Sequence, residues 1–403
     1  MFYASKFIAL MKSRLVNFLL TSAFIFASGF FLISASHATL VEIPEVIKAE
    51  VPAPSVDVKS WILADFETGW ILGSKDADLQ IEPASLTKLM TSYLVFDALS
   101  KGEIAMQDKV YVSKKAWKTP GSKMFIQVDT YVTIEELIQG LIIQCGNDAA
   151  VALAEHIGGT EEGFAARMNL ASAKIGMVNS SFANSSGLPA DNHYSTARDM
   201  TLLSISLIRK FPKLFKYYSH LEYTYNDITQ QNRNVLLTRD PTVDGLKTGY
   251  TKKAGYCLIG TANREGTRLV ATITGSNSKS ARANQVQSLL QFGYGAYDGL
   301  VVYSPGDQVK ALPLWMGTQP EVSVSVPQNL GIIFPKGKKD LLSAALELPE
   351  SLEAPINSGT EVGHIQVKFD GNPVLRSPLL IKERYDEGPW YSQLLDSIKQ
   401  MIF

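Results

Sequence analysis

Pro83-Ala84-Ser85-Leu86-Thr87-Lys88 is the stretch of this 403-residue chain that most strongly predicts its fold. It opens an apolar run, which indicates a helix that begins close to Ser85. Residues three apart on a helix lie on one face, so Ser85 and Lys88 are expected to point into the same space. A desolvated lysine with a lowered pKa can take the proton of a serine hydroxyl, so the pair predicts a nucleophile beside its base. The alternative is an N-cap serine followed by a surface lysine.

A second polar motif, Lys247-Thr248-Gly249, lies within a predicted strand. The segments 243–250, 256–262 and 269–274 are apolar and rich in β-branched residues, which is typical of adjacent antiparallel strands. A lysine ammonium, a threonine hydroxyl and a glycine that allows close backbone approach suit the capture of a carboxylate. Taken alone, the motif would more simply be a polar strand end with a turn glycine.

Between these motifs lies Ile142-Ile143-Gln144-Cys145-Gly146-Asn147-Asp148, flanked by two predicted helical runs. The first run begins at Thr133 with Glu136 three residues on, a capping box. The second runs from Asp148 and ends at the two glycines 158–159. From about Trp61 to Arg282 the chain resembles the serine D-alanyl-D-alanine carboxypeptidases, the low-molecular-weight penicillin-binding proteins of peptidase family S11. The stretches 184–189, 193–199 and 232–234 also carry this resemblance.

The order of the predicted elements indicates an α/β (α+β) fold. Residues 61–65 and 69–72 predict a hairpin, a long helical stretch follows from Ser85 to about Lys210, and the strands around Lys247 come last. This order implies an antiparallel sheet that is built from both ends of the domain and covered by helices. The resemblance implies the same β-lactamase-like or DD-peptidase-like fold, and the catalytic domain is predicted over residues 59–300.

The resemblance also implies a role for individual residues. Ser85 would attack the carbonyl of the penultimate D-alanine of a peptidoglycan pentapeptide, with Lys88 as its base. Cys145 stands where the family has a serine that bridges the lysine and the leaving amine. Because a thiol is a weaker hydrogen-bonding group than a hydroxyl, we expect activity at an altered rate. For substrate binding, the resemblance implies that Asn147 contacts the peptide backbone and that the N–H groups of Tyr250 and Ser85 hold the oxyanion. The terminal carboxylate would be bound by Lys247, Thr248 and Arg233, with Gly249 in the same motif.

The implied function is the release of terminal D-alanine through an acyl-enzyme that β-lactam antibiotics also form, in cell-wall biogenesis and cell shape. Neither a cofactor nor a metal is expected. Two alternatives stay open. A class A β-lactamase shares two of the motifs but adds Glu-Xaa-Xaa-Leu-Asn, which does not occur between Asn147 and Lys247. A penicillin-binding scaffold weakened by Cys145 would bind the ligand without turnover.

The N-terminal 38 residues predict a signal peptide, followed by a linker over residues 39–58. Cleavage is expected after Ala38, with export to the periplasm, and an uncleaved anchor is the alternative. The supporting features are the basic residues Lys6, Lys12 and Arg14, the apolar run 15–33, and the small-residue site Ser36-His37-Ala38. The two cysteines, Cys145 and Cys257, are expected to be free thiols, and a net charge of −1 does not suggest nucleic-acid binding.

The C-terminal part predicts two further elements. Residues 306–383 alternate in short strands and turns, which indicates a small all-β domain without a cluster of catalytic residues. Residues 389–403 predict an amphipathic helix of roughly 22 Å at ~1.5 Å per residue, too short to cross a bilayer. We expect this helix to lie on the outer face of the inner membrane. The alternative is a helix docked on the β-rich domain.

Overall fold

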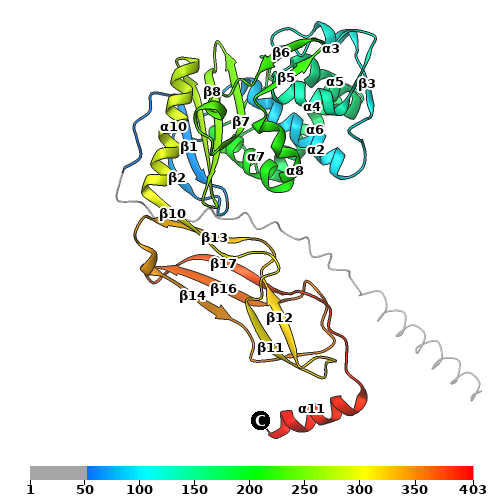
Figure 1. Ribbon diagram of the computed structural model, residues 1–403, viewed down its shortest axis with the longest axis vertical. Coiled ribbons are helices and arrows are strands. Elements are labelled where there is room, and N and C mark those ends of the chain that lie inside the picture. The colour runs from blue at the N-terminus through cyan, green and yellow to red at the C-terminus, as the bar shows by residue number, and fades with distance from the viewer. Residues whose placement is uncertain (1–51, 403) are drawn as a thin grey trace, which may run out of the picture. The chain divides into compact units, whose positions relative to one another are not determined.

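The computed structural model describes residues 52–402, so the predicted signal peptide and most of the predicted linker lie outside the described part. A five-stranded antiparallel sheet has the order β2-β1-β9-β8-β7 (Figure 1). Its strands are β1 (Ser60–Asp65), β2 (Ile71–Lys75), β7 (Val243–Thr251), β8 (Gly255–Arg264) and β9 (Thr267–Ser276). Because β1 pairs with β9, with Ser60 opposite Thr274, the predicted sheet from both ends of the domain is confirmed.

Helices cover both faces of this sheet. On one face α10 (Lys279–Ala296) packs its Val286 and Leu289 against apolar strand residues such as Leu258 and Leu269. The other face meets the helical part of the domain, in a core that includes Ile259. Neighbouring strand residues 258 and 259 thus belong to different cores, as expected when successive side chains alternate across a sheet.

The helical part is less continuous than predicted. Its elements are η1 (Ala84–Thr87), α2 (Lys88–Ser100), α3 (Lys114–Lys118), α4 (Ile134–Ile142), α5 (Asn147–Gly158), α6 (Glu161–Ile175), α7 (Ala197–Lys210), α8 (Pro212–Phe215), η2 (Lys216–Ser219) and α9 (Leu236–Arg239). A small hairpin of β3 (Lys109–Tyr111) and β4 (Tyr131–Thr133) interrupts the predicted run from Ser85 to Lys210, and Tyr111 and Tyr131 stack edge to face within it. A second hairpin joins β5 (Glu222–Tyr225) to β6 (Ile228–Gln231).

The structure confirms one local prediction from the sequence and corrects another. The capping box is confirmed, since the Thr133 side chain accepts from the Glu136 N–H and the Glu136 carboxylate accepts from the Thr133 N–H. The start of the first helix is later than predicted. Ser85 lies in the 3₁₀ turn η1, after Ala84 with a left-handed φ of 49°, and the α-helix proper begins at Lys88.

The C-terminal part is all-β, as predicted, and has its own core around Leu312, Val322, Ile365 and Leu379. A six-stranded sheet has the order β14-β16-β17-β12-β11-β15, and β10 pairs separately with β13. The strands are β10 (Tyr297–Tyr303), β11 (Lys310–Trp315), β12 (Glu321–Ser325), β13 (Leu330–Pro335), β14 (Leu342–Glu347), β15 (Leu352–Glu353), β16 (Glu361–Phe369) and β17 (Asn372–Ile381), with the 3₁₀ turn η3 (Lys339–Leu341) before β14. The helix α11 (Trp390–Ile402) follows.

Candidate active site

Three elements bring the candidate catalytic residues together. The turn η1 and the start of α2 carry Ser85 and Lys88, the loop between α4 and α5 carries Cys145, and β7 carries Lys247. Close packing of β7 on η1 depends on Gly249, because a Cβ there would lie 3.2 Å from the carbonyl oxygen of Pro83. The glycine of the Lys-Thr-Gly motif therefore lets β7 approach the segment that carries Ser85.

Lys88 is arranged to act as a base toward Ser85. Its Nζ lies 3.3 Å from Ser85 Oγ, 2.6 Å from Asn147 Oδ1 and 2.5 Å from the carbonyl oxygen of Ser186. The ammonium form donates to all three oxygens, whereas the neutral amine keeps two N–H groups for the two carbonyl oxygens and can turn its lone pair to the Ser85 hydroxyl. Burial lowers the pKa of Lys88 to about 8, so the neutral form is accessible near neutral pH.

Cys145 and Lys247 form a second close pair in the candidate site. Lys247 Nζ donates to Cys145 Sγ at 2.9 Å, and both side chains are buried. Burial opposes ionisation of the thiol, but the charges of Lys247 and Lys88 outweigh it and lower the pKa of Cys145 to about 6. Burial also lowers the pKa of Lys247, against the influence of the thiolate. The close contact favours a thiolate–ammonium pair, where a serine would remain neutral.

Asn147 links Lys88 to the loop that borders the candidate site. Its Oδ1 accepts from Lys88, its Nδ2 donates to the carbonyl oxygen of Pro120 at 2.6 Å, and its N–H donates to that of Ser122 at 2.7 Å. The next residue, Asp148, accepts from the N–H groups of Met124 and Phe125, each at 2.9 Å. The start of α5 thus fixes the loop that borders the site.

The remaining predicted residues lie on or beside β7. This strand is the edge of the sheet, so one side of its backbone is open to an added strand. Thr248 is buried, whereas Tyr250 is 51% exposed and lies against the Tyr256 ring with centroids 4.4 Å apart. Arg233 is exposed, and within residues 52–402 it has no recorded hydrogen bond or ion pair. Its charge contributes to the lowered pKa values of Lys88 and Lys247, which places it near both.

The structure adds supporting residues that the motifs did not identify. The carbonyl oxygen of Ser186 accepts from Lys88, and the neighbouring Ser185 donates to Glu161 through its hydroxyl at 2.8 Å. His193 Nδ1 accepts from the Ala183 N–H, so Nε2 carries the hydrogen and donates to Thr87 Oγ1 at 2.8 Å. Burial lowers the pKa of His193 to about 4, which keeps this ring neutral. The stretches 184–189 and 193–199 supported the resemblance, but nothing in them indicated these contacts.

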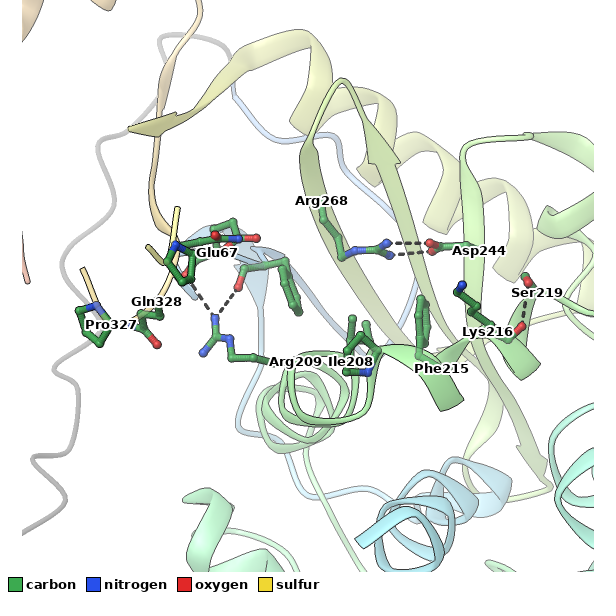
Figure 2. Close-up of a pocket in the computed structure, with 14 residues that line it drawn as sticks. Glu67, Ile208, Arg209, Phe215, Lys216, Ser219, Asp244, Arg268, Pro327 and Gln328 are labelled. Atoms are coloured by element: carbon green, nitrogen blue, oxygen red, sulfur yellow. Dashed lines mark hydrogen bonds and ion pairs between the residues drawn. The ribbon is translucent and has the colours of Figure 1, made fainter. Parts of the chain in front are cut away.

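A separate cavity of about 580 Å³ contains none of the candidate site residues (Figure 2). Arg268 lines it and makes a bidentate ion pair with Asp244, with both N–O distances 2.7 Å. The guanidinium also lies over the Phe215 ring, 5.2 Å from its centroid. Because Asp244 is on β7 and Arg268 on β9, this pair ties the start of β7 to the sheet. Across residues 52–402 no group of three His, Cys, Asp or Glu side chains is placed to hold a metal ion.

A serine beside a buried lysine, facing Lys-Thr-Gly on the edge strand of a sheet, defines the class of penicillin-recognising serine enzymes. Within that class, the model of the D-alanyl-D-alanine carboxypeptidase family matches residues 47–278, and that of the penicillin-binding protein 5 C-terminal domain matches residues 297–387. The chain belongs to the D-alanyl-D-alanine carboxypeptidase family, which confirms the family predicted from the motifs.

Similarity to characterised proteins extends over most of the chain. It is 36% identical to D-alanyl-D-alanine carboxypeptidase DacC of Escherichia coli K12 over 365 residues, which cover 88% of this chain and 91% of that protein. It is 34% identical to DacA of the same organism, covering 92% and 93%. The solved structure of penicillin binding protein 5 from Haemophilus influenzae is 34% identical and superposes with a TM-score of 0.74, covering 84% of this chain and all of that one.

Proposed function

We propose that this protein is a serine D-alanyl-D-alanine carboxypeptidase. It removes the terminal D-alanine from peptidoglycan pentapeptides and is acylated by β-lactam antibiotics, with a role in cell-wall biogenesis and cell shape. The observation that carries the proposal is the environment of Lys88, whose buried Nζ lies 3.3 Å from Ser85 Oγ and donates to two carbonyl oxygens. Membership of the family supports the choice of substrate.

Acylation follows from the placement of these groups. The peptide pairs with the open edge of β7, with its terminal carboxylate near Thr248, Lys247 and Arg233. Lys88 takes the proton of Ser85 as the oxygen attacks the penultimate D-alanine carbonyl, and the N–H groups of Ser85 and Tyr250 hold the oxyanion. Preorganised donors of this kind are each worth about 10²–10³-fold in rate.

The leaving amine must then receive a proton. Lys88 holds the proton taken from Ser85, and Cys145, which lies between the charges of the two lysines, passes it to the nitrogen of the departing D-alanine. Water afterwards attacks the acyl-enzyme, again with Lys88 as base, and regenerates Ser85. In this scheme Cys145 takes the place of a hydroxyl relay.

The decisive experiment is an assay of D-alanine release from a synthetic pentapeptide that ends in D-alanyl-D-alanine. We expect catalytic turnover and stoichiometric covalent labelling by a fluorescent penicillin on the same protein. Labelling without any release of D-alanine would show a penicillin-binding scaffold instead. Rapid turnover of penicillin with no action on the peptide would show a β-lactamase.

Replacing Cys145 with serine tests the proposed relay. We expect the variant to remain active, within roughly tenfold of the parent, about 1.4 kcal/mol in activation free energy. Since the thiolate charge raises the pKa of Lys88, its loss should move the ascending limb of the kcat/KM profile to lower pH. The measurement is D-alanine release between pH 5 and 10.

Chemical modification gives an independent check on the same residue. A small thiol reagent that reaches Cys145 should inhibit, and a bound β-lactam should protect. Cys257 is fully buried in the sheet and serves as the internal control. Full activity after stoichiometric modification of Cys145 would remove this residue from the site.

We propose that the protein is exported to the periplasm and lies on the outer face of the inner membrane through α11. The exposed side chains Trp390, Tyr391, Leu394 and Ile398 form an apolar face along this helix. On the other side, Asp396 accepts from the N–H of Met316 in the β-rich part at 3.0 Å. No helix within residues 52–402 is both long and apolar enough to cross a bilayer. Because α11 makes a polar contact to the β-rich part on one side and exposes an apolar face on the other, a position of α11 at the membrane interface is supported.

Removing α11 should release the protein from membranes without loss of activity. The cut belongs after Gly388, because Tyr385 is 3% exposed and pairs with Ile356. The four exposed apolar side chains contribute about 1.5–3 kcal/mol each when buried. The full mature chain, from residue 39, should therefore co-sediment with lipid vesicles in 1 M salt, where electrostatic binding is screened by a Debye length of about 3 Å. Failure of the full chain to bind vesicles, or unfolding of the shortened chain, would identify α11 as a docked structural helix.

A further inference from the structure

The contact between Cys145 and Lys247 offers a reaction that the proton relay of the proposed function does not use. The thiol sulfur and the amine nitrogen lie 2.9 Å apart, so the two atoms touch with no group between them. A serine hydroxyl at position 145 could relay a proton, but it could not be oxidised by a peroxide as a thiol can. The chemistry of this contact is therefore specific to a chain with cysteine at this position.

Backbone hydrogen bonds hold both ends of this contact. Cys145 has a left-handed φ of 61° in the turn between α4 and α5, and the next residue, Gly146, donates through its N–H to the carbonyl oxygen of Gly140 at 2.9 Å. Lys247 lies in the middle of β7, opposite Ile259 of β8. Both side chains of the pair are only 3% exposed. The sulfur and the nitrogen therefore stay next to each other in the folded chain.

Cys145 is the thiol that a peroxide should oxidise. The positive charges of Lys247 and Lys88 lower its pKa to about 6, so the sulfur is a thiolate near neutral pH. Burial raises the pKa of Cys257 to about 11, so the sulfur of this second cysteine stays protonated. Because the thiolate is the nucleophile in such reactions, oxidation is directed to Cys145. A site that admits a peptide also admits a molecule as small as hydrogen peroxide.

Lys247 is the amine best placed to react with an oxidised sulfur. Burial lowers its pKa, which favours the neutral and nucleophilic form, and the thiolate charge opposes this shift. Conversion of the thiolate into a neutral sulfenic acid removes that charge, so the first oxidation step itself favours deprotonation of Lys247. The amine of Lys88 is engaged by Asn147 Oδ1 at 2.6 Å and by the Ser186 carbonyl oxygen at 2.5 Å. Lys247 therefore faces the sulfur as the available amine.

We propose that Cys145 and Lys247 form a reversible sulfur–nitrogen cross-link when hydrogen peroxide reaches the site. The thiolate attacks one peroxide oxygen, the O–O bond breaks, and the products are a sulfenic acid and hydroxide. The neutral Lys247 amine then attacks the same sulfur. The S–N bond forms as the S–O bond breaks, and the departing hydroxide takes one amine proton and leaves as water. The sulfur loses two electrons overall, and these electrons reduce the peroxide.

A thiol reductant reverses the cross-link. Its thiolate attacks the sulfur of Cys145, the S–N bond breaks, and Lys247 recovers its proton. A second thiol then releases Cys145 as a thiol and leaves the reductant as a disulfide. Because the cross-linked sulfur is held at the oxidation level of a sulfenic acid, it is also protected from irreversible oxidation to a sulfinic acid.

The effect of the cross-link on catalysis rests on the proposed function. In that scheme Lys247 binds the terminal carboxylate of the substrate, and Cys145 relays a proton to the leaving amine. The cross-link removes the ammonium charge and the relay thiol together, so the oxidised protein should lose its action on the peptide and on penicillin, which also carries a carboxylate. The enzyme is thus switched off by oxidation and recovered by reduction.

The test treats the purified mature protein with hydrogen peroxide and measures its mass without any substrate. We expect the intact mass to fall by that of two hydrogen atoms. A tryptic digest should contain a species that joins the segments around residues 145 and 247 and that dithiothreitol separates. D-alanine release and penicillin acylation should fall at least about tenfold on treatment, since a charge-assisted hydrogen bond to the carboxylate is lost, and should return to within about twofold after reduction.

Three variants serve as controls, each compared with its own untreated sample. Lys247→Arg keeps a positive charge beside the thiol but removes the nucleophilic amine, so a sulfenic acid should persist and be trapped by dimedone. Cys145→Ser should lose no activity on treatment with peroxide. Cys257→Ala, at the second buried cysteine, should form the cross-link as the parent does.

Three results would overturn the cross-link: an unchanged mass, a sulfenic or sulfinic acid at Cys145 without a link, or a link to Lys88 in place of Lys247. Because the mass measurement needs no substrate, its outcome does not depend on the proposed function. If the cross-link forms but the untreated protein releases no D-alanine, the proposed function alone fails.

Discussion

Ser85→Ala is expected to abolish covalent labelling by penicillin and to lower D-alanine release by at least about 10⁴-fold. The hydroxyl that Lys88 faces is the only group removed, and in the proposed function the acyl bond forms on that oxygen. Alanine fits the 3₁₀ turn without a new contact, and the melting temperature should be unchanged. Intact-protein mass after exposure to penicillin and a thermal melt provide the two readouts.

A matched control exists within the same chain. Ser276-Asn277-Ser278-Lys279 is a second Ser-Xaa-Xaa-Lys string, but it spans the end of β9 and the start of α10. Ser276→Ala should therefore keep penicillin labelling and turnover. If Ser85→Ala still gains the mass of the antibiotic, the nucleophile is another residue.

Lys88→Met is expected to lower the acylation rate constant by about 10²–10⁴-fold, the usual contribution of a general base. In the parent, activity should rise as pH increases through about 8, because the amine must lose its proton before it can accept that of Ser85. The variant should lose this limb of the profile, as measured by stopped-flow acylation between pH 5 and 10. The change also leaves Asn147 Oδ1 and the Ser186 carbonyl without a donor, at a cost of about 1–3 kcal/mol each.

The pH profile of that variant distinguishes two bases. Methionine cannot titrate, so a limb that persists near pH 8 would exclude Lys88 as its origin. A limb above about pH 6 would instead indicate the Cys145 thiolate, whose pKa of about 6 in the parent rises when the charge of Lys88 is removed. Loss of the limb together with retained penicillin binding would leave Lys88 as the base.

Patterns in the sequence predicted the parts of the fold that depend on local chemistry. The capping box at Thr133 and the apolar strands around Lys247 are such signals, because both arise from residues close in sequence. The 3₁₀ turn at Ser85 and the β3–β4 hairpin were not predicted. Both depend on tertiary packing, since the turn packs against β7 and α2, and β3 pairs with β4 across the intervening helix α3.

In the candidate site, too, local features could be predicted from the sequence and tertiary contacts could not. Side chains in motifs could be identified, but the partners of Lys88 include a backbone carbonyl at Ser186, and backbone groups have no signature in a sequence. The string at Ser276 shows that spacing alone does not select the nucleophile. Only burial of the lysine beside the hydroxyl does so, and that requires the folded chain. The thiolate–ammonium pair of Cys145 and Lys247 is likewise a contact between distant segments.

The pairing of β1 with β9 determines when the candidate active site can form during synthesis of the chain. β1 can pair with β2 at once, but Ser60 and its neighbours find their partners in β9 only after Thr274 has been made, and closing so long a loop is entropically slow. A nascent chain that stops before β7 can form α2 with Ser85 and Lys88, but it lacks the strand on which the peptide would lie. Until β9 arrives, β1 also keeps an open edge that could pair with other chains. Newly made copies are therefore inert toward both peptide and antibiotic until the last strand of the sheet is in place.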